Sequence, residues 1–372
     1  MFFRDIIGQE KLIEHLRHTI ENENLAHAQL FCGPAGHGGV PLAMAFAQYL
    51  QCDHPTNGEP CGVCPSCKQH QQFVHPDMHF VFPIVKKNES DTCDTYLAPW
   101  RSFLVDRPYF GYGEWLSHLG AEKKQALIYA SESEEIARKM KFKPYSAKYK
   151  VLLVWMPEKM HIACANKLLK FIEEPPEHTI ILMVSEEPDL VLGTIQSRSQ
   201  RINIPPIGSK ALEQAMRNQY GLTAEDATHI THLAKGNLLT ATDIISVNKE
   251  KEYYLTTFIN MMRLSWARDI AGMKQLAEDL SKIGRERQKA LFAYFQHLTR
   301  ENFIKHFDST DLNYMNRAEN TFSTKFSPYV NERNVIDIMN ELTLAESHIT
   351  QNTNAKMVFF DTFLRLSVLI RR

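Results

Sequence analysis

The feature that most constrains this chain is a short apolar segment followed by a glycine-rich turn and a longer apolar segment. Residues 28–32 are expected to form a strand, and residues 42–50 have the composition of a buried helix. Between them lies Gly33-Pro34-Ala35-Gly36-His37-Gly38-Gly39-Val40. A strand, a glycine loop and a helix in this order form the opening unit of a parallel α/β domain.

The glycine loop matches the phosphate-binding pattern G-x-x-x-x-G-K-[ST] at its glycines but not at its last two positions. In a working loop the lysine contacts the β- and γ-phosphates, and the Ser or Thr hydroxyl holds Mg²⁺. Here Gly39 has no side chain and Val40 has no oxygen, while Pro41 removes one backbone donor. The remaining frame (Gly33, Gly36, Gly38 and Gly39) is expected to bind anions weakly at most, so tight ATP binding is not expected. The alternative is a glycine-rich turn that precedes a helix by chance.

A second loss concerns the acidic residues that a hydrolytic site needs after a buried strand, where they hold Mg²⁺ and polarise the attacking water. The apolar run 151–154 is followed by Trp155-Met156-Pro157. Glu158 lies three residues beyond the position where the first carboxylate is needed, so we do not expect it to replace that group. The two losses together argue against ATP hydrolysis by this chain.

Apolar runs at residues 78–85, 151–154 and 179–184 are bounded by turn residues, as is typical of parallel strands buried on both faces. The segment 86–124 is different, because it is rich in aromatics and follows no single period. Its aromatic residues include Tyr96, Trp100, Phe103, Tyr109, Phe110, Tyr112 and Trp115. We interpret it as an insertion that packs its aromatics on the domain surface, and we assign it no function.

The rest of the chain is expected to be helical. Pro205-Pro206 ends the α/β region, since neither residue can donate to a strand ladder. A small helical unit follows from Ser209 to about Val247, and residues 250–372 show helical periodicity with little strand signal. A chain of 372 residues is too long for one ordinary core. We therefore predict three domains, at residues 1–206, 207–248 and 249–372.

The composition argues against a protein that is drawn to nucleic acid by its overall charge and against a membrane protein. The formal net charge is −1, so no overall positive field attracts nucleic acid or a membrane surface, and any nucleic-acid contact must be local. The hydrophobic share of 44% and the charged share of 23% are those of an ordinary globular protein. No apolar run approaches the roughly 18 residues that a membrane span needs. We expect a cytoplasmic protein without a membrane partner.

Four of the seven cysteines crowd into sixteen positions with the spacing C-x8-C-x2-C-x2-C; they are Cys52, Cys61, Cys64 and Cys67. Two residues between cysteines let both thiolates turn toward one ion, and four thiolates complete a tetrahedral Zn²⁺ shell. Such a closed site is structural rather than catalytic. The alternatives are a disulfide, which is rare in a cytosolic chain, and replacement of one cysteine by His54, His70 or His75.

Longer motifs add a family resemblance. They are Ile6-Ile7-Gly8-Gln9-Glu10, His75-Pro76-Asp77, the run 165–176 (Ala-Asn-Lys-Leu-Leu-Lys-Phe-Ile-Glu-Glu-Pro-Pro), the run 194–200 (Thr-Ile-Gln-Ser-Arg-Ser-Gln), and the pair 345–348 and 352–356. With the glycine loop and the cysteines, they resemble the clamp-loader branch of the AAA+ proteins, and within it the delta-prime subunits of bacterial DNA polymerase III. The resemblance covers nearly the whole chain except the aromatic insertion.

The resemblance implies an α/β AAA+ P-loop domain, whose parallel sheet carries helices on both faces and an inserted zinc knuckle. It also implies a small helical lid and an all-α C-terminal collar domain. In the family, subunits with intact loops bind ATP, whereas delta-prime subunits reach a neighbour's nucleotide through a serine-arginine-cysteine motif. Arg198 would then be an arginine finger acting in trans. Ser199 stands where the family usually has cysteine.

Two neighbouring motifs have plainer interpretations. Arg198 could instead be a surface arginine that caps a helix or pairs with Glu186 or Glu187. The carboxylates of Glu173-Glu174-Pro175-Pro176 are expected to be solvated at a helix end, and we assign them no catalytic role. Leu239 resembles the position where AAA+ ATPases carry a nucleotide-sensing arginine, which a leucine cannot replace.

These observations favour a non-hydrolysing, delta-prime-like subunit that works in a hetero-oligomer. Its implied partners are a gamma/tau-like ATPase, a delta-like subunit, the sliding clamp and primed DNA. One alternative is an ATP-hydrolysing gamma/tau-like subunit whose loop has drifted. Another is a zinc-knuckle protein that binds nucleic acid alone, which predicts tight and salt-sensitive DNA binding by the monomer.

Overall fold

The computed structural model describes residues 1–22, 24–305, 315 and 317–372. The chain divides into two compact units, Met1–Ile245 and Ser246–Arg372. Its main hydrophobic clusters lie within residues 3–204, 207–245 and 254–370. The division into three domains at residues 206 and 248 stays a prediction. None of the described helices combines the length and the apolar character that a membrane crossing requires.

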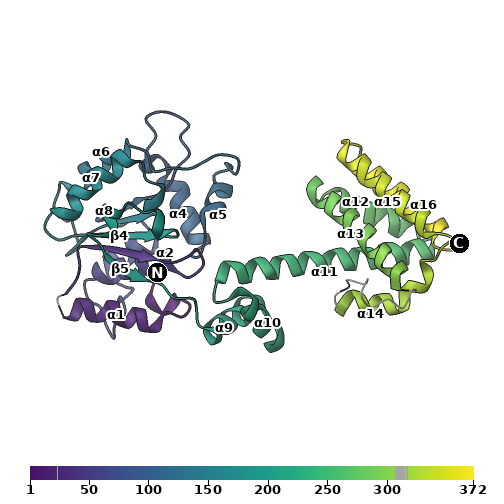
Figure 1. Ribbon diagram of the computed structural model, residues 1–372, viewed down its shortest axis with the longest axis horizontal. Helices are drawn as coiled ribbons and strands as arrows, with labels where there is room; N and C mark the ends of the chain where they lie inside the picture. Colours follow the sequence, from purple (N-terminus) through teal and green to yellow (C-terminus); the bar gives the residue numbers. More distant parts are fainter. Residues whose placement is uncertain (23, 306–314, 316) are drawn as a thin grey trace. The chain divides into compact units, whose positions relative to one another are not determined.

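A five-stranded parallel sheet forms the centre of the first unit (Figure 1). Its strands are β1 (Ala28–Cys32), β2 (Met78–Val81), β3 (Lys150–Trp155), β4 (Thr179–Ser185) and β5 (Gln200–Asn203), in the order β2-β3-β4-β1-β5. Every residue of β1, β3 and β4 is buried, as expected for parallel strands covered on both faces. The carboxyl ends of β1 and β4 are neighbours, and this is the edge where ligands bind in open α/β sheets.

Helices surround this sheet, and Figure 1 shows it between α1 on one side and α6 and α7 on the other. The helices of the sheet region are α1 (Glu10–Glu21), α2 (Gly39–Leu50), α3 (Pro65–Gln71), α4 (Leu97–Asp106), α5 (Tyr112–His118), α6 (Glu132–Met140), α7 (Ile162–Glu173) and α8 (Gly193–Gln196). The lid region begins with α9 (Ser209–Tyr220) and α10 (Ala224–Ala234). The long helix α11 (Leu238–Ala267) starts in the first unit and ends in the second.

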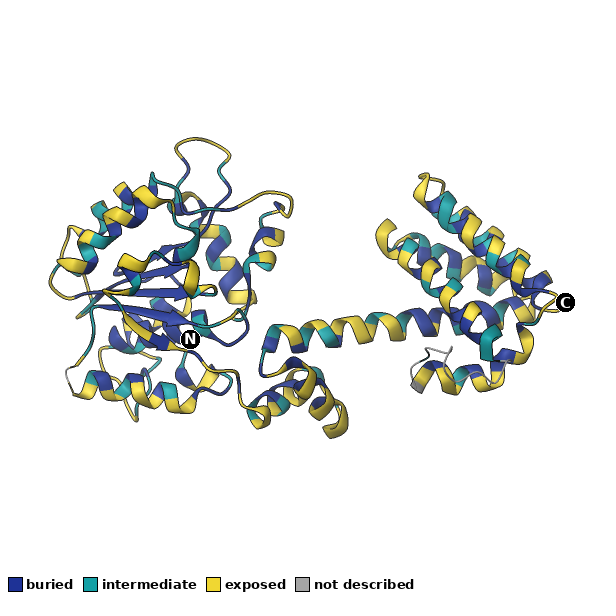
Figure 2. Cartoon of the chain, viewed as in Figure 1, coloured by how far each residue is buried: buried dark blue, intermediate teal, exposed yellow. Residues whose placement is uncertain are grey.

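The second unit is helical throughout its described part, as the periodicity of residues 250–372 predicts. Its further helices are α12 (Ile270–Ser281), α13 (Arg285–Ile304), α14 (Arg317–Phe326), α15 (Val335–Thr350) and α16 (Ala355–Leu369). Buried faces alternate with exposed ones along these helices (Figure 2), and the rings of Phe292 and Phe359 stack 4.8 Å apart between α13 and α16. The family motif at residues 352–356 caps α16, because the Asn354 side chain accepts a bond from the Met357 amide.

The aromatic insertion differs from its prediction. Trp100, Phe103 and Trp115 are at most 1% exposed, so they form core rather than lie on the domain surface. Trp100 stacks on Phe82 at 4.2 Å and on Trp155 at 5.4 Å between ring centroids. The insertion therefore folds as α4 and α5 against the ends of β2 and β3. Its partners are distant in sequence, so a local period could not reveal them.

Candidate nucleotide site and metal centre

The glycine loop connects β1 to α2 at the carboxyl edge of the sheet. Gly36 and Gly38 have φ angles of +88° and +96°, which side-chain-bearing residues rarely adopt. At Gly39 the constraint is space, since a Cβ there would lie 2.9 Å from Cγ1 of Val184. Val184 is a buried residue of β4 and has little freedom to move. A side chain at the position that carries lysine in a working loop would therefore require Val184 to shift.

The lid lies directly on the glycine loop. The Asn237 side-chain amide donates to the Ala35 carbonyl at 2.6 Å, and the Leu238 amide donates to the Gly36 carbonyl at 3.1 Å. Leu239, the predicted substitute for a sensing arginine, is in this contact too, because its amide nitrogen would lie 3.0 Å from a Cβ built on Gly36. Asn237 belongs to the same sequence motif as Leu239, but its contact with the loop was not predicted. The left-handed Lys235 and Gly236 just before it form a tight helix connection.

Little empty space remains beside the loop. The hollow between the loop glycines, Tyr109, Phe110, Val184 and Glu186 has a volume of about 20 Å³. A space of that size holds about one water molecule, whereas pockets for organic ligands measure roughly 300–1,000 Å³. In this conformation the site has no room for a nucleotide.

Trp155 stands at the end of β3, where a hydrolytic site would carry an acidic residue, and it contacts Glu186 just after β4. The Trp155 indole donates to a carboxylate oxygen of Glu186 at 3.1 Å, and burial raises the pKa of Glu186 to about 7. Glu158 accepts the backbone amides of Glu186 at 3.0 Å and of Glu187 at 3.2 Å, which fixes the turn after β4. An acidic group beside the loop repels phosphate whenever it is ionised.

Arg198 lies just after α8, and its side chain is 43% exposed. Its Nε atom is 2.6 Å from a carboxylate oxygen of Glu173, the last residue of α7. Its Nη1 atom donates to the Thr194 carbonyl at 3.3 Å. The carboxylate beside Arg198 is therefore that of Glu173, not Glu186 or Glu187, and the guanidinium remains partly accessible from outside.

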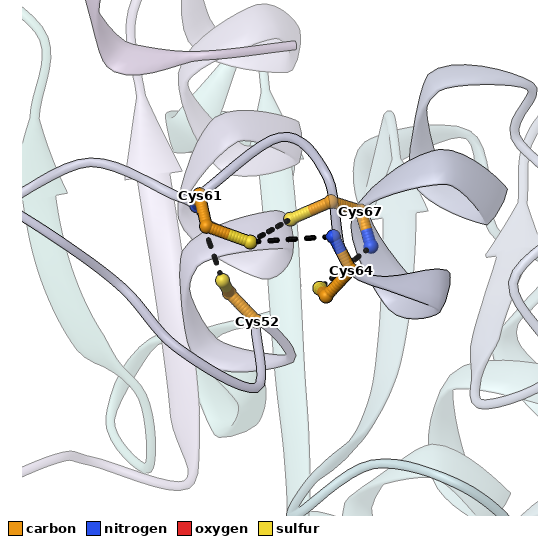
Figure 3. Close-up of side chains that lie close together, drawn as sticks. All are labelled: Cys52, Cys61, Cys64 and Cys67. Carbon is orange, nitrogen blue, oxygen red and sulfur yellow. Dashed lines mark hydrogen bonds between the residues drawn. The ribbon is translucent and has the colours of Figure 1, made fainter.

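The four clustered cysteines come together as their spacing predicts (Figure 3), with all four sulfurs within 4.8 Å of one another. The loop and the start of α3 hold them, because Cys64 caps that helix and Pro65 fills its first position. Backbone amides point at the sulfurs: Cys61 donates to Cys52 at 3.2 Å, and Cys64 and Cys67 donate to Cys61 and Cys64 at 3.4 Å. The sulfurs of Cys61 and Cys67 are 4.0 Å apart.

This arrangement suits a metal ion. Sulfurs about 2.3 Å from one tetrahedral ion lie about 3.8 Å apart, close to the separations observed. The amides of Val63 and Cys64 lower the pKa of the Cys61 thiol to about 6, which favours the thiolate form that metals bind. In the described residues the ligand group consists of cysteines alone, and His70, one proposed substitute, instead bonds to Gln51 at 2.6 Å.

The parallel sheet, the altered phosphate-binding loop at its carboxyl edge and the helical lid define an AAA+ domain. A family model described as DNA polymerase III, delta subunit, matches residues 8–208, more than half of the chain. The chain belongs to this family of clamp-loader subunits.

Two sequence relatives agree with this assignment. The chain is 30% identical over 210 residues to DNA polymerase III subunit tau of Bacillus subtilis, covering 56% of this chain and 30% of that protein. It is 25% identical over 248 residues to subunit delta' of the same organism, covering 66% of this chain and 60% of that protein. The matched part thus spans less than two thirds of either relative. A gamma subunit-related protein of Thermotoga maritima aligns over 96% of this chain and 99% of its own, with 15% identity and a TM-score of 0.39.

Proposed function

We propose that this chain is a non-hydrolysing, delta-prime-type subunit of a DNA polymerase III clamp loader. It would assemble with gamma/tau-like ATPase subunits and a delta-like subunit, and support ATP-driven loading of the sliding clamp onto primed DNA. The observation that carries the proposal is the absence of the phosphate-binding lysine at Gly39, whose close packing against Val184 also disfavours a side chain at that position. A subunit that cannot hold the γ-phosphate can still contribute to an ATP-driven complex, either as a structural component or by acting on the ATPase site of a neighbouring subunit.

Reconstitution tests this proposal. The isolated chain should show no Mg²⁺-dependent ATP turnover and no heat of ATP binding at micromolar concentrations. Clamp loading by gamma/tau-like and delta-like subunits should depend on adding the chain. ATP turnover by the chain alone would instead support the ATP-hydrolysing alternative, which the 30% identity to a tau subunit favours. Tight, salt-sensitive DNA binding by the monomer would support a stand-alone nucleic-acid binder, against which the net charge of −1 argues.

We propose further that Arg198 acts in trans as an arginine finger. Its support is the partly exposed guanidinium just after α8, which pairs with the exposed carboxylate of Glu173 and also donates to the Thr194 carbonyl. The Arg198→Ala variant should lower the DNA-stimulated ATPase of the reconstituted loader by at least about a thousandfold if the finger is of the usual strength. Arg201→Ala is a matched control, since Arg201 is also exposed and donates to the Asn203 side chain, two residues away, at 3.0 Å. Equal activities of the two variants would end the proposal.

For the metal centre we propose one structural Zn²⁺ held by the four cysteines. Its support is the sulfur geometry and the backbone amides that point at the sulfurs. Elemental analysis should give one zinc ion per chain, and Cys61→Ser should lower that content. Cys164→Ala is the control, because Cys164 is buried in α7 away from the cluster. A folded wild-type preparation that takes up no zinc would contradict the assignment.

A further inference from the structure

The loop between α4 and α5 places an aromatic side chain where three parts of the first unit meet. The Tyr109 hydroxyl accepts the Ile7 backbone amide at 2.8 Å, which ties the aromatic insertion to the N-terminal segment. A ring carbon of Tyr109 would lie 3.1 Å from a Cβ on Gly38, so the ring also touches the glycine loop. The same ring packs against the hydrophobic cluster of the lid. One residue therefore contacts the N-terminal segment, the loop and the lid together.

The two residues that follow extend this contact. The Phe110 ring packs edge-to-face on Trp155 with 4.9 Å between centroids. A Cβ on Gly111 would lie 3.2 Å from Ala35 Cβ and 3.7 Å from Leu239 Cδ1, so Gly111 touches both the loop and the start of α11. We call residues 109–111 the aromatic wedge. It lies at the carboxyl edge of the sheet, where open α/β folds place their ligands.

The wedge makes contacts of the kind that a bound ligand makes: a ring in an apolar setting, one directional hydrogen bond to backbone, and contact with the glycine loop. Burial raises the pKa of Tyr109 to about 12, so the hydroxyl stays neutral at physiological pH. The lid is joined to the same place by the Asn237–Ala35 and Leu238–Gly36 bonds. The hollow that is left beside Tyr109 and Phe110 has room for about one water.

We propose that the aromatic wedge is a built-in ligand: Tyr109 takes the place of a nucleotide and fixes the lid to the glycine loop whether or not ATP is present. This gives the aromatic insertion a function. It concerns the isolated chain and does not depend on membership of a clamp loader. Because the ligand is part of the chain, its local concentration does not change with the nucleotide supply.

Hydrogen exchange followed by mass spectrometry of the full chain tests the proposal. Tyr109→Phe removes only the hydroxyl, so peptides containing Ile7 should exchange about fivefold faster, as expected for one lost hydrogen bond. Tyr109→Ala also empties the ring site, so α9 and α10 should exchange about a hundredfold faster. Peptides of β3 and β4 should keep their wild-type rates in both variants.

Tyr112→Phe is the matched control. The Tyr112 hydroxyl accepts the Ala126 amide at 2.7 Å and lies in the same insertion, but Tyr112 is not among the residues packed on the lid cluster. The lid should therefore exchange at the wild-type rate in this variant. Adding p-cresol to Tyr109→Ala should slow lid exchange again, because cresol has the shape of the missing ring.

Two results would overturn the proposal. One is wild-type lid exchange in Tyr109→Ala. The other is slower lid exchange in the wild-type chain on addition of MgADP, since that would show an open nucleotide site that the wedge does not occupy. The MgADP measurement needs no variant, and Tyr109→Phe is conservative, so the test stands even if Tyr109→Ala fails to fold.

Discussion

The carboxylate of Asp77 organises a loop far from it in sequence. It is 1% exposed and accepts the backbone amides of Tyr145 at 2.6 Å, Ser146 at 2.7 Å and Ala147 at 3.0 Å. This loop leads into β3, the neighbour of β2 in the sheet. Burial opposes ionisation, but these amides outweigh it and lower the pKa of Asp77. The important feature is a negative charge held by three backbone amides, and the neutral variant Asp77→Asn removes that charge.

The expected cost follows from these three bonds. A hydrogen bond to a charged group contributes about 1.5–3 kcal/mol when buried, and such contributions do not add fully. Tyr145 is 86% exposed, so its freed amide is able to reach water and recover part of the loss. We therefore expect Asp77→Asn to lower the free energy of unfolding of the first unit by about 3 kcal/mol.

Tryptophan fluorescence during urea unfolding measures this value. Trp100, Trp115 and Trp155 are all fully buried in the first unit, so a Trp266→Phe background confines the signal to that unit. A loss of about 3 kcal/mol should lower the urea midpoint by about 1 M. The matched control is Asp94→Asn, because Asp94 forms a partly exposed ion pair with Lys139 and should cost less than about 1 kcal/mol.

The pH dependence supplies the decisive check. A depressed carboxyl pKa contributes stability that is present above the unfolded-state value of about 3.9 and is lost as pH falls through the folded-state value. The difference between wild type and Asp77→Asn should therefore be full at pH 6 and shrink below about pH 4. Equal stability of Asp77→Asn and Asp94→Asn, or a pH-independent difference, would refute the reasoning.

Three further predictions concern other parts of the first unit. Burial, with Lys139 and Lys150 nearby, lowers the pKa of His79 to about 4. Below about pH 6.5 the imidazole is therefore protonated in the unfolded chain but stays neutral in the folded chain until the pH falls to about 4. Relative to His79→Gln, wild type should lose about 2 kcal/mol between pH 7 and pH 5, measured by urea unfolding at both pH values. Gly36→Ala should speed lid exchange at least about tenfold, because its Cβ would lie 2.2 Å from the Asn237 side-chain oxygen at a left-handed φ; an unchanged rate would show that the lid does not rest on the loop. Glu173→Gln, which removes the ion pair with Arg198, should change stability by less than about 1 kcal/mol. On the proposal that Arg198 acts in trans, it should also raise the stimulated ATPase of the reconstituted loader by up to about fivefold. A fall in that rate would mean that Glu173 positions the arginine.

Much of the sheet could be predicted from the sequence, because buried parallel strands are nearly all apolar. The predicted strand at 28–32 is β1 residue for residue, and those at 151–154 and 179–184 are within one residue of β3 and β4. The run 78–85 was predicted too long, since Pro83 cannot donate to a ladder and β2 ends at Val81. The helix expected from residue 42 begins at Gly39, because Pro41 is tolerated in a first turn. Strand β5 was missed, since only Ile202 of its residues is buried.

Of the candidate sites, the one built from neighbouring residues could be predicted from the sequence, and those built from distant segments could not. The cysteine cluster could be predicted because its four residues lie within sixteen positions of the sequence, and their spacing alone indicates that the sulfurs come together. Contacts between distant segments carry no such signal. Nothing near Tyr109 in the sequence distinguishes it from the other aromatics of the insertion, and its partner Ile7 is 102 residues away. The same holds for Glu173, whose pairing with Arg198 depends on how α7 and α8 meet.

The structure changes the meaning of the missing lysine. The sequence shows that side chains which bind phosphate and Mg²⁺ are absent at Gly39, at Val40 and after residues 151–154. The structure adds that the surroundings are packed closely: Gly39 lies against Val184, Trp155 stands at the position of an acidic residue, and Tyr109 lies beside the loop. We expect that a lysine at position 39 alone would press against Val184 in the buried strand β4. It should lower the stability of the domain and should not produce nucleotide binding. Packing, in addition to the loss of the lysine, therefore supports the proposal that this domain does not hydrolyse ATP.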